Sequence, residues 1–237
     1  MKTLGTVVVS ATALLVATTA VASVSKDEAK RLNEATALIS EVRNSPDSGI
    51  PERIWDKAQC VVVIPSLKKA AFIVGGEFGS GVMSCKHANT WGAPIFMQLT
   101  KGSAGFQIGA QSTDLVLVVM NRSGVDKLLG NKVTLGADAS IAAGPAGRGA
   151  TAATDAQMSA EMLSYSRARG LFAGVDLSGG TLRPDDSANA KAYGSNVSAR
   201  DIALGTRPVA MSAEARAFTN ALSSNVRATT GVKKSKY

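Results

Sequence analysis

The spacing of apolar residues divides the chain into helical ends and a β-rich middle. A first helix is expected at residues 25–43, opened by Ser25 and Glu28 as a capping box. Its apolar positions recur at helical spacing: Leu32, Ala35, Leu38, Ile39 and Val42. A short second helix is expected from Pro51 to Gln59.

The middle of the chain reads as successive strands. Residues 60–64 form an apolar run that we expect to end at Pro65, and residues 70–74 form another. Residues 75–81 are rich in glycine and predict a hairpin turn into a strand at 82–86. Residues 132–143 alternate apolar and polar positions, which predicts one half-buried strand. Further strands are expected at 94–101, 105–111, 114–120, 161–168, 171–177 and 181–182.

Helical patterns return at the end of the chain. They cover residues 184–193, residues 198–204 with a Ser198/Asp201 capping box, and a longer helix capped by Ser212. Strands grouped between helices, rather than alternating with them, predict the α+β class. We therefore expect a curved, largely antiparallel β-sheet or partial barrel core, flanked by N- and C-terminal helices, in a single domain spanning residues 23–230.

The two ends of the chain are expected to lie outside this domain. Residues 1–22 combine Lys2, an apolar stretch and Ala20-Val21-Ala22, which is typical of a cleavable signal peptide. An uncleaved membrane anchor is the alternative, although the apolar stretch is short and diluted by serine and threonine. Residues 231–237 form a basic tail. The expected location is therefore periplasmic or secreted.

The charge balance narrows the class of partner. The chain carries 26 Lys and Arg residues against 18 Asp and Glu, a formal net charge of +8. In an exported protein this favours anionic partners such as lipid headgroups, although net charge can also serve solubility alone. Aromatic residues make up 5% of the chain and no long basic run occurs, so we expect no nucleic-acid partner.

Cys60 and Cys85 are the only cysteines. An even count in an oxidising compartment predicts a disulfide between them, with two free buried thiols as the alternative. The cysteines and the lone His87 do not make a convincing ligand set for a metal ion. We predict no metal site and no cofactor.

Enzymatic motifs are incomplete. Ser66 and Lys69 match the S-x-x-K pattern of penicillin-binding enzymes, but the partner motifs do not follow in order. His87 is the only histidine, and no nucleophile elbow accompanies it. We therefore predict a protein that is not an enzyme.

Two glycine-containing segments carry arginines that could bind an anion. In the block of residues 165–174, strand alternation places Arg167 and Arg169 on one face, about 6–7 Å apart. Arg148 lies in a glycine-rich turn whose backbone amides could face an anion. Lys68, Lys69 and Lys101 are weaker candidates. The alternative, that Arg167 and Arg169 brace the core or are simply solvated, stays open.

Ordered blocks along the chain resemble the SYLF family, also called the Ysc84-type lipid- and actin-binding domain. The resemblance extends over residues 34–222. The blocks are CVVVIP at 60–65, FIVGG at 72–76, GSGV at 79–82, WGAP at 91–94, GFQIG at 105–109, LGAD at 135–138, GPAGR at 144–148, the block at 165–174, and YG at 193–194.

The resemblance implies a binding module with a curved β core. Eukaryotic members bind phosphoinositide membranes and some bind actin, whereas this sequence has an export signal, no adaptor domain and the Cys60/Cys85 pair. The expected function is therefore binding of anionic phospholipid headgroups at a membrane surface in the bacterial envelope. The candidate contacts are Arg148, Arg167, Arg169, Lys68, Lys69 and Lys101. A structural or protein-interaction role with an envelope protein partner is the alternative.

Overall fold

The computed structural model describes residues 24–44, 49–71, 74–104, 111–130, 132–146, 159–168 and 171–224. The expected signal peptide and basic tail lie outside these ranges. The helices are α1 (Lys26–Arg43), α2 (Glu52–Lys57), α3 (Arg122–Leu128), α5 (Asp186–Tyr193), α6 (Ala199–Leu204) and α7 (Ala213–Ser223). The strands are β1 (Cys60–Ala71), β2 (Val74–His87), β3 (Thr90–Trp91), β4 (Ile95–Ala104), β5 (Gln111–Val119), β6 (Val133–Thr134), β7 (Ile141–Ala143), β8 (Met162–Ala168), β9 (Leu171–Gly174) and β10 (Thr181–Pro184).

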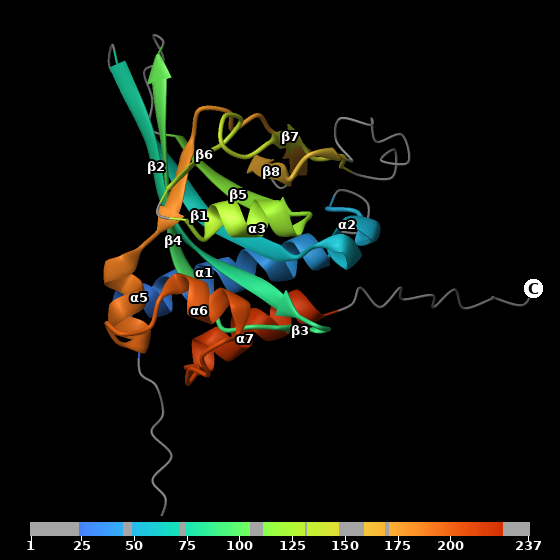
Figure 1. Cartoon of the computed structure of the whole chain (residues 1–237). Coiled ribbons are helices and arrows are strands. Elements are labelled where there is room, and N and C mark those ends of the chain that lie inside the picture. The colour runs from blue at the N-terminus through green and yellow to red at the C-terminus, as the bar shows by residue number, and fades with distance from the viewer. Residues whose placement is uncertain are drawn as a thin grey trace, which may run out of the picture.

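The strands form one curved sheet with helices on both faces (Figure 1). Its order is β6-β10-β4-β2-β1-β5-β8-β7, while β3 pairs with β2 and β9 pairs with β8. Neighbouring strands are antiparallel except for the parallel pair β7–β8. The predicted α+β class and largely antiparallel core are therefore confirmed.

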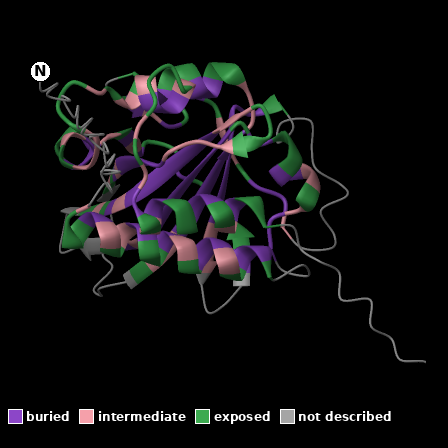
Figure 2. Cartoon of the chain, turned by 90° about the horizontal axis from the view of Figure 1, so that it is seen from below, coloured by how far each residue is buried: buried purple, intermediate pink, exposed green. Residues whose placement is uncertain are grey.

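Each face of the sheet has its own apolar core, because the central strands are apolar at nearly every position. Helices α1, α2, α5 and α7 pack on one face, over Val61, Val63, Val82 and Phe96. Helices α3 and α6 pack on the other face, over residues that include Val62, Met83 and Leu117. Figure 2 shows the buried strands between the helical layers, whose outward faces are exposed.

The prediction that Pro65 ends the first strand is wrong. β1 continues to Ala71, and its register with β2 and β5 shifts around Pro65, where Ser66 adopts a positive φ of 58°. The bulge lets the ladder resume after a residue that cannot donate a backbone hydrogen bond.

The glycine-rich run at residues 75–81 is not a turn but part of β2. A Cβ on Gly79 would lie 2.5 Å from Cγ2 of Ile64, and one on Gly81 would overlap the carbonyl oxygen of Val63. These glycines therefore allow the bulged strand to lie close to β2.

Residues 132–143 do not form one strand. β6 ends at Thr134 and β7 begins at Ile141, with a turn between them in which Gly136 has a φ of 86°. The Thr134 carbonyl accepts the backbone N–H of Asp138, and the Asp138 carboxylate accepts the Thr134 N–H. Asp138 therefore closes a local turn, and such side-chain bonds compete with an extended strand.

Helix termini agree with the sequence in part. The Ser198/Asp201 capping box is present, and Ser212 accepts the Ala215 N–H. Ser25 stands at the start of α1, but its side chain makes no capping bond, so the first capping box is wrong. Across the described ranges, no helix combines the length and apolar character needed to cross a bilayer.

Candidate functional site

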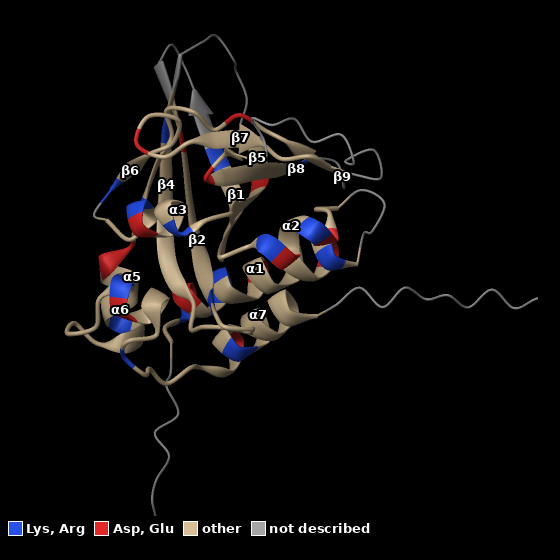
Figure 3. Cartoon of the chain, turned by 45° about the vertical axis from the view of Figure 1, so that its right-hand side comes forward, with Lys and Arg blue, Asp and Glu red and all other residues tan. Residues whose placement is uncertain are grey.

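Three of the six basic candidates, Arg167, Lys68 and Lys101, are described with their side chains, and these three lie on different strands. Arg148 and Arg169 lie outside the described residues, and Lys69 is described only in its backbone within β1. Arg167 lies on β8, Lys68 on β1 and Lys101 on β4. Figure 3 shows basic and acidic residues interspersed over the helices. The candidates must therefore be judged one by one.

Arg167 is held by carboxylates of the same chain. Its Nε and Nη2 donate to Oδ2 of Asp114 on β5, at 2.9 and 2.6 Å, and Nη1 pairs with Glu41 on α1. The other carboxylate oxygen of Asp114 accepts the backbone N–H of Ser66 at 2.9 Å. Arg167 thus ties α1 to the sheet beside the β1 bulge, which is the bracing role that the sequence left open.

We expect Arg167→Gln to lower the free energy of unfolding by about 1–2 kcal/mol, because Asp114 and Glu41 would then face each other without a cation. Urea unfolding measures this change. Arg183→Gln is the matched control, since Arg183 is exposed and bonds only Gln98 among the described residues. A loss at Arg167 no larger than the control loss would contradict the bracing role.

Lys68 and Phe78 share an exposed part of the sheet. Phe78 on β2 is directly opposite Lys68 on β1 and Thr100 on β4, and Lys68 is opposite Ser112 on β5. Such partners lie on the same face of a sheet. The Phe78 side chain is 60% exposed, and no other large apolar side chain of the described ranges is exposed. Lys68 is also exposed and makes no ion pair with another described residue.

Lys101 lies on the opposite face at the same end of the sheet, because its partner on β2 is Glu77, the neighbour of Phe78. Its Nζ donates to the Asp176 carbonyl oxygen at 3.1 Å. Hydrogen bonds from Ser178 lower the pKa of the Asp176 carboxyl. Lys101, Glu77, Thr113 and Asp176 border a cavity of about 240 Å³.

A larger cavity of about 660 Å³ lies beside α2, but its basic groups are already bound. The Arg43 guanidinium lies 5.0 Å from the Trp55 ring centre and pairs with Glu52 at 3.0 Å. Lys86 Nζ lies 5.0 Å from the Trp91 ring centre and donates to the Trp55 carbonyl oxygen at 2.8 Å. Burial lowers the pKa of Lys86. These contacts tie α2 to β2 and β3.

The glycines near Tyr165 serve close packing. Tyr165 is fully buried, and a Cβ on Gly144 would overlap its ring. A Cβ on Gly174 would lie 2.5 Å from the Gly144 carbonyl oxygen. Burial raises the pKa of Tyr165. Gly174 therefore lets the backbone at Gly144 approach closely.

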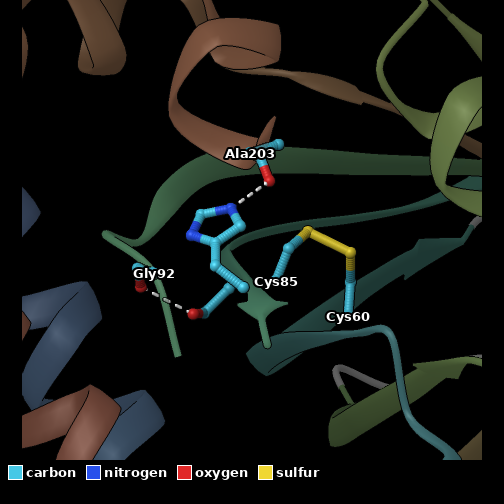
Figure 4. The surroundings of a disulfide bond; sticks show 6 residues. Cys60, Cys85, Gly92 and Ala203 are labelled. Atoms are coloured by element: carbon cyan, nitrogen blue, oxygen red, sulfur yellow. Dashed lines mark hydrogen bonds between the residues drawn. A yellow bond between two sulfur atoms is a disulfide. The ribbon is translucent and has the colours of Figure 1, made fainter. Parts of the chain in front are cut away.

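The disulfide predicted from the cysteine count is present between Cys60 and Cys85, which are directly opposite on β1 and β2 (Figure 4). His87 follows it, and its Nε2 lies 2.7 Å from the Ala203 carbonyl oxygen. Within the described ranges, no group of three or more His, Cys, Asp or Glu residues is placed to hold a metal ion.

Sequence reasoning missed Phe78, because it lay inside the run assigned to a turn. It also missed Asp114 and Glu41, which lie 53 and 126 positions from Arg167. The sequence did offer one signal for this end of the sheet. Residues 70–76, which follow Lys69, and residues 102–110, which follow Lys101, contain no charged side chain.

Comparison with known proteins identifies related sequences. A family model described as "Ysc84: Las17-binding protein actin regulator" matches residues 100–225. SH3 domain-containing YSC84-like protein 1 of Rattus norvegicus is 34% identical over 194 residues, covering 81% of this chain and 56% of that protein. LAS seventeen-binding protein 3 of Saccharomyces cerevisiae is 35% identical over 163 residues, covering 67% of this chain and 35% of that protein. The chain thus spans about half the length of the rat relative and about a third of the yeast relative.

Proposed function

The chain belongs to the Ysc84 family, also called SYLF, and on this premise we propose that it is a non-enzymatic module that binds anionic lipid headgroups at a membrane surface in the bacterial envelope. The relatives are named for binding and regulation rather than for a reaction. The observation that carries the proposal is the exposed Lys68 beside the exposed Phe78 at one end of the sheet. A cation next to an apolar ring suits the boundary between headgroups and acyl chains.

The overall charge and the disulfide support the location in this proposal. A net charge of +8 attracts the protein to an anionic surface within about a Debye length. The Cys60–Cys85 disulfide fits an oxidising compartment outside the cytoplasm. Lys68 and Lys101 are the described side chains assigned to phosphate contacts, and Arg148, Arg169 and Lys69 remain candidates from the sequence.

Vesicle co-sedimentation tests the proposal. We expect binding to phosphatidylcholine vesicles that contain phosphatidylglycerol, weaker binding at high salt, and little binding to phosphatidylcholine alone. The double variant Lys68→Gln/Lys101→Gln should bind about 25-fold more weakly, at about 1 kcal/mol per lysine near the surface. Lys26→Gln/Lys30→Gln on α1 is the control of equal charge. No binding by the unmodified protein would refute the function, and equal losses in both variants would refute the residue assignment.

The second candidate function is a structural or protein-interaction component of the envelope. The name of the yeast relative, LAS seventeen-binding protein 3, favours it. Under this alternative, the purified protein would carry a stoichiometric protein partner and would bind anionic vesicles no better than neutral ones. Mass spectrometry of material purified under native conditions separates the two functions, because lipid and protein are both detected.

A further inference from the structure

Four neighbouring strands continue past the rest of the sheet. β10 pairs with β4 as far as Thr100, and β8 pairs with β5 as far as Asp114 on the main ladder. Beyond these points, β4, β2, β1 and β5 still pair with each other, as in Val74↔Ala104 and Lys69↔Gln111. Figure 1 shows the ends of β2 and β4 projecting beyond the helices. From Lys101 to Ala104 the projection is about 10 Å long. We call these strand ends the sheet extension.

The described positions of the sheet extension are rich in glycine. Its paired positions on β2 and β4 include Gly75, Gly76, Gly102 and Ser103. Gly76 and Gly102 are exposed. A Cβ on Gly102 would meet no atom within 4 Å, and a Cβ on Gly76 would meet only the Lys101 carbonyl oxygen at 3.9 Å. Gly76 and Gly102 are directly opposite each other, so the face of the sheet that carries Phe78 is open at this level.

Charge stops at the base of the sheet extension. Lys68 lies at the base on one face and Lys101 on the other, with the exposed Phe78 beside Lys68. Further along, the sequence has no charged residue at positions 70–76 or 102–110. Residues 72–73 and 105–110 lie outside the described residues. Along the strand direction, cations on both faces are thus followed by an uncharged end. A membrane interface has the same order along its normal, because charged headgroups are followed by apolar chains.

We propose that the sheet extension enters the interfacial region of an anionic bilayer end-on. Lys68 and Lys101 then lie at the level of the lipid phosphates, with Phe78 beside Lys68 at the same level. The outer edges of β4 and β5 have no strand partner among the described residues at this level. Unpaired backbone groups are costly in hydrocarbon, so penetration stops within the interface. This inference rests on the proposed function and adds the orientation in which the protein contacts the membrane.

Matched substitutions at the two open glycines test the insertion. Gly76→Asp/Gly102→Asp places two carboxylates on the sheet extension without a steric clash, and Gly76→Asn/Gly102→Asn has nearly the same shape without charge. We expect the Asp pair to bind phosphatidylglycerol vesicles at least tenfold more weakly than the Asn pair. Repulsion between each carboxylate and the anionic surface should lower the affinity about fivefold. Equal binding by the two pairs would overturn the insertion.

A spectroscopic probe separates this inference from the function itself. Gly102→Trp places an indole in open space, and its emission is read against the unmodified protein, which contains Trp55 and Trp91. On phosphatidylglycerol vesicles with brominated acyl chains, we expect a blue shift and quenching of the added emission. If the variant sediments with vesicles but its added emission is unchanged, the insertion is wrong and the function stands. If the unmodified protein does not sediment at all, the function fails first.

Discussion

Replacing both cysteines, as Cys60→Ala/Cys85→Ala, should lower the free energy of unfolding by about 3.5 kcal/mol. The disulfide joins residues 25 positions apart, and its loss frees that loop in the unfolded chain. Both cysteines are buried, so the alanines also remove packed sulfur atoms. Because small proteins are stable by only about 5–15 kcal/mol, the change should be large in urea unfolding.

The reduced, unmodified protein is the control for this prediction. It keeps both side chains and loses only the bond, so it should account for most of the loss shown by the double variant. Intact-mass measurement before and after reduction confirms that the bond is present in the starting material. Equal unfolding midpoints for oxidised and reduced protein would contradict a stabilising disulfide.

Replacing Glu161 with glutamine should lower the free energy of unfolding by about 2 kcal/mol. Glu161 precedes β8, and its carboxylate accepts hydrogen bonds from Lys127 Nζ at 2.7 Å, from the Ser140 N–H at 2.8 Å and from the Ser123 hydroxyl. These groups join α3 and the residue before β7 to the start of β8. Glutamine keeps part of the geometry but loses the charge that strengthens every one of these bonds.

The shifted pKa of Glu161 determines how the stabilisation by its carboxylate should change with pH. Burial alone would raise the pKa of Glu161, but the hydrogen bonds from Lys127, Ser123 and Ser140 outweigh it and lower the pKa to about 2. A carboxyl with a depressed pKa in the folded state stabilises the protein above its unfolded pKa of about 4.5. That contribution is lost as the pH falls from about 4.5 to about 2.

The stability difference between the unmodified protein and Glu161→Gln should therefore be full at neutral pH and shrink across this acidic range. Urea unfolding at pH 7, 4 and 3 measures it. Glu34→Gln is the control, because Glu34 forms an exposed pair with Lys30 on α1 and should contribute under about 0.5 kcal/mol. A difference that stays constant across this range would contradict the role of the charged form.

The strands and helices followed from local patterns wherever neighbours in sequence decide the structure. Helix α6 carries its capping box within four residues, and the apolar run of β5 is buried as expected. The failures came where a distant segment changed the meaning of a local signal. The glycines of β2 suggested a turn, yet they are required by the bulge of β1. The sequence did not indicate that bulge, because Pro65 is typical of the end of a strand. Residues 132–143 alternate like a strand, but the hydrogen bond of the Asp138 carboxylate closes a turn within them.

The candidate site could be predicted only as a set of residue types. The sequence identified Lys68 and Lys101 as basic residues near glycines, but their positions on opposite faces depend on the register of β1, β2 and β4. Exposure of Phe78 likewise depends on which helices reach that end of the sheet. Neither the strand register nor the reach of the helices can be inferred from a few neighbouring residues.

The sequence by itself determined the fold class, the helical flanks, the cysteine pair and the family, because these depend on short-range periodicity, on counting and on ordered blocks. Only the tertiary structure decided the roles of the charged residues. Arg167 was a candidate for anion binding until Asp114 and Glu41 were found against it, while Lys68 and Phe78 were left exposed at the end of the sheet. Whether a charge is paired or exposed depends on contacts between residues far apart in the chain, and folding alone brings these together.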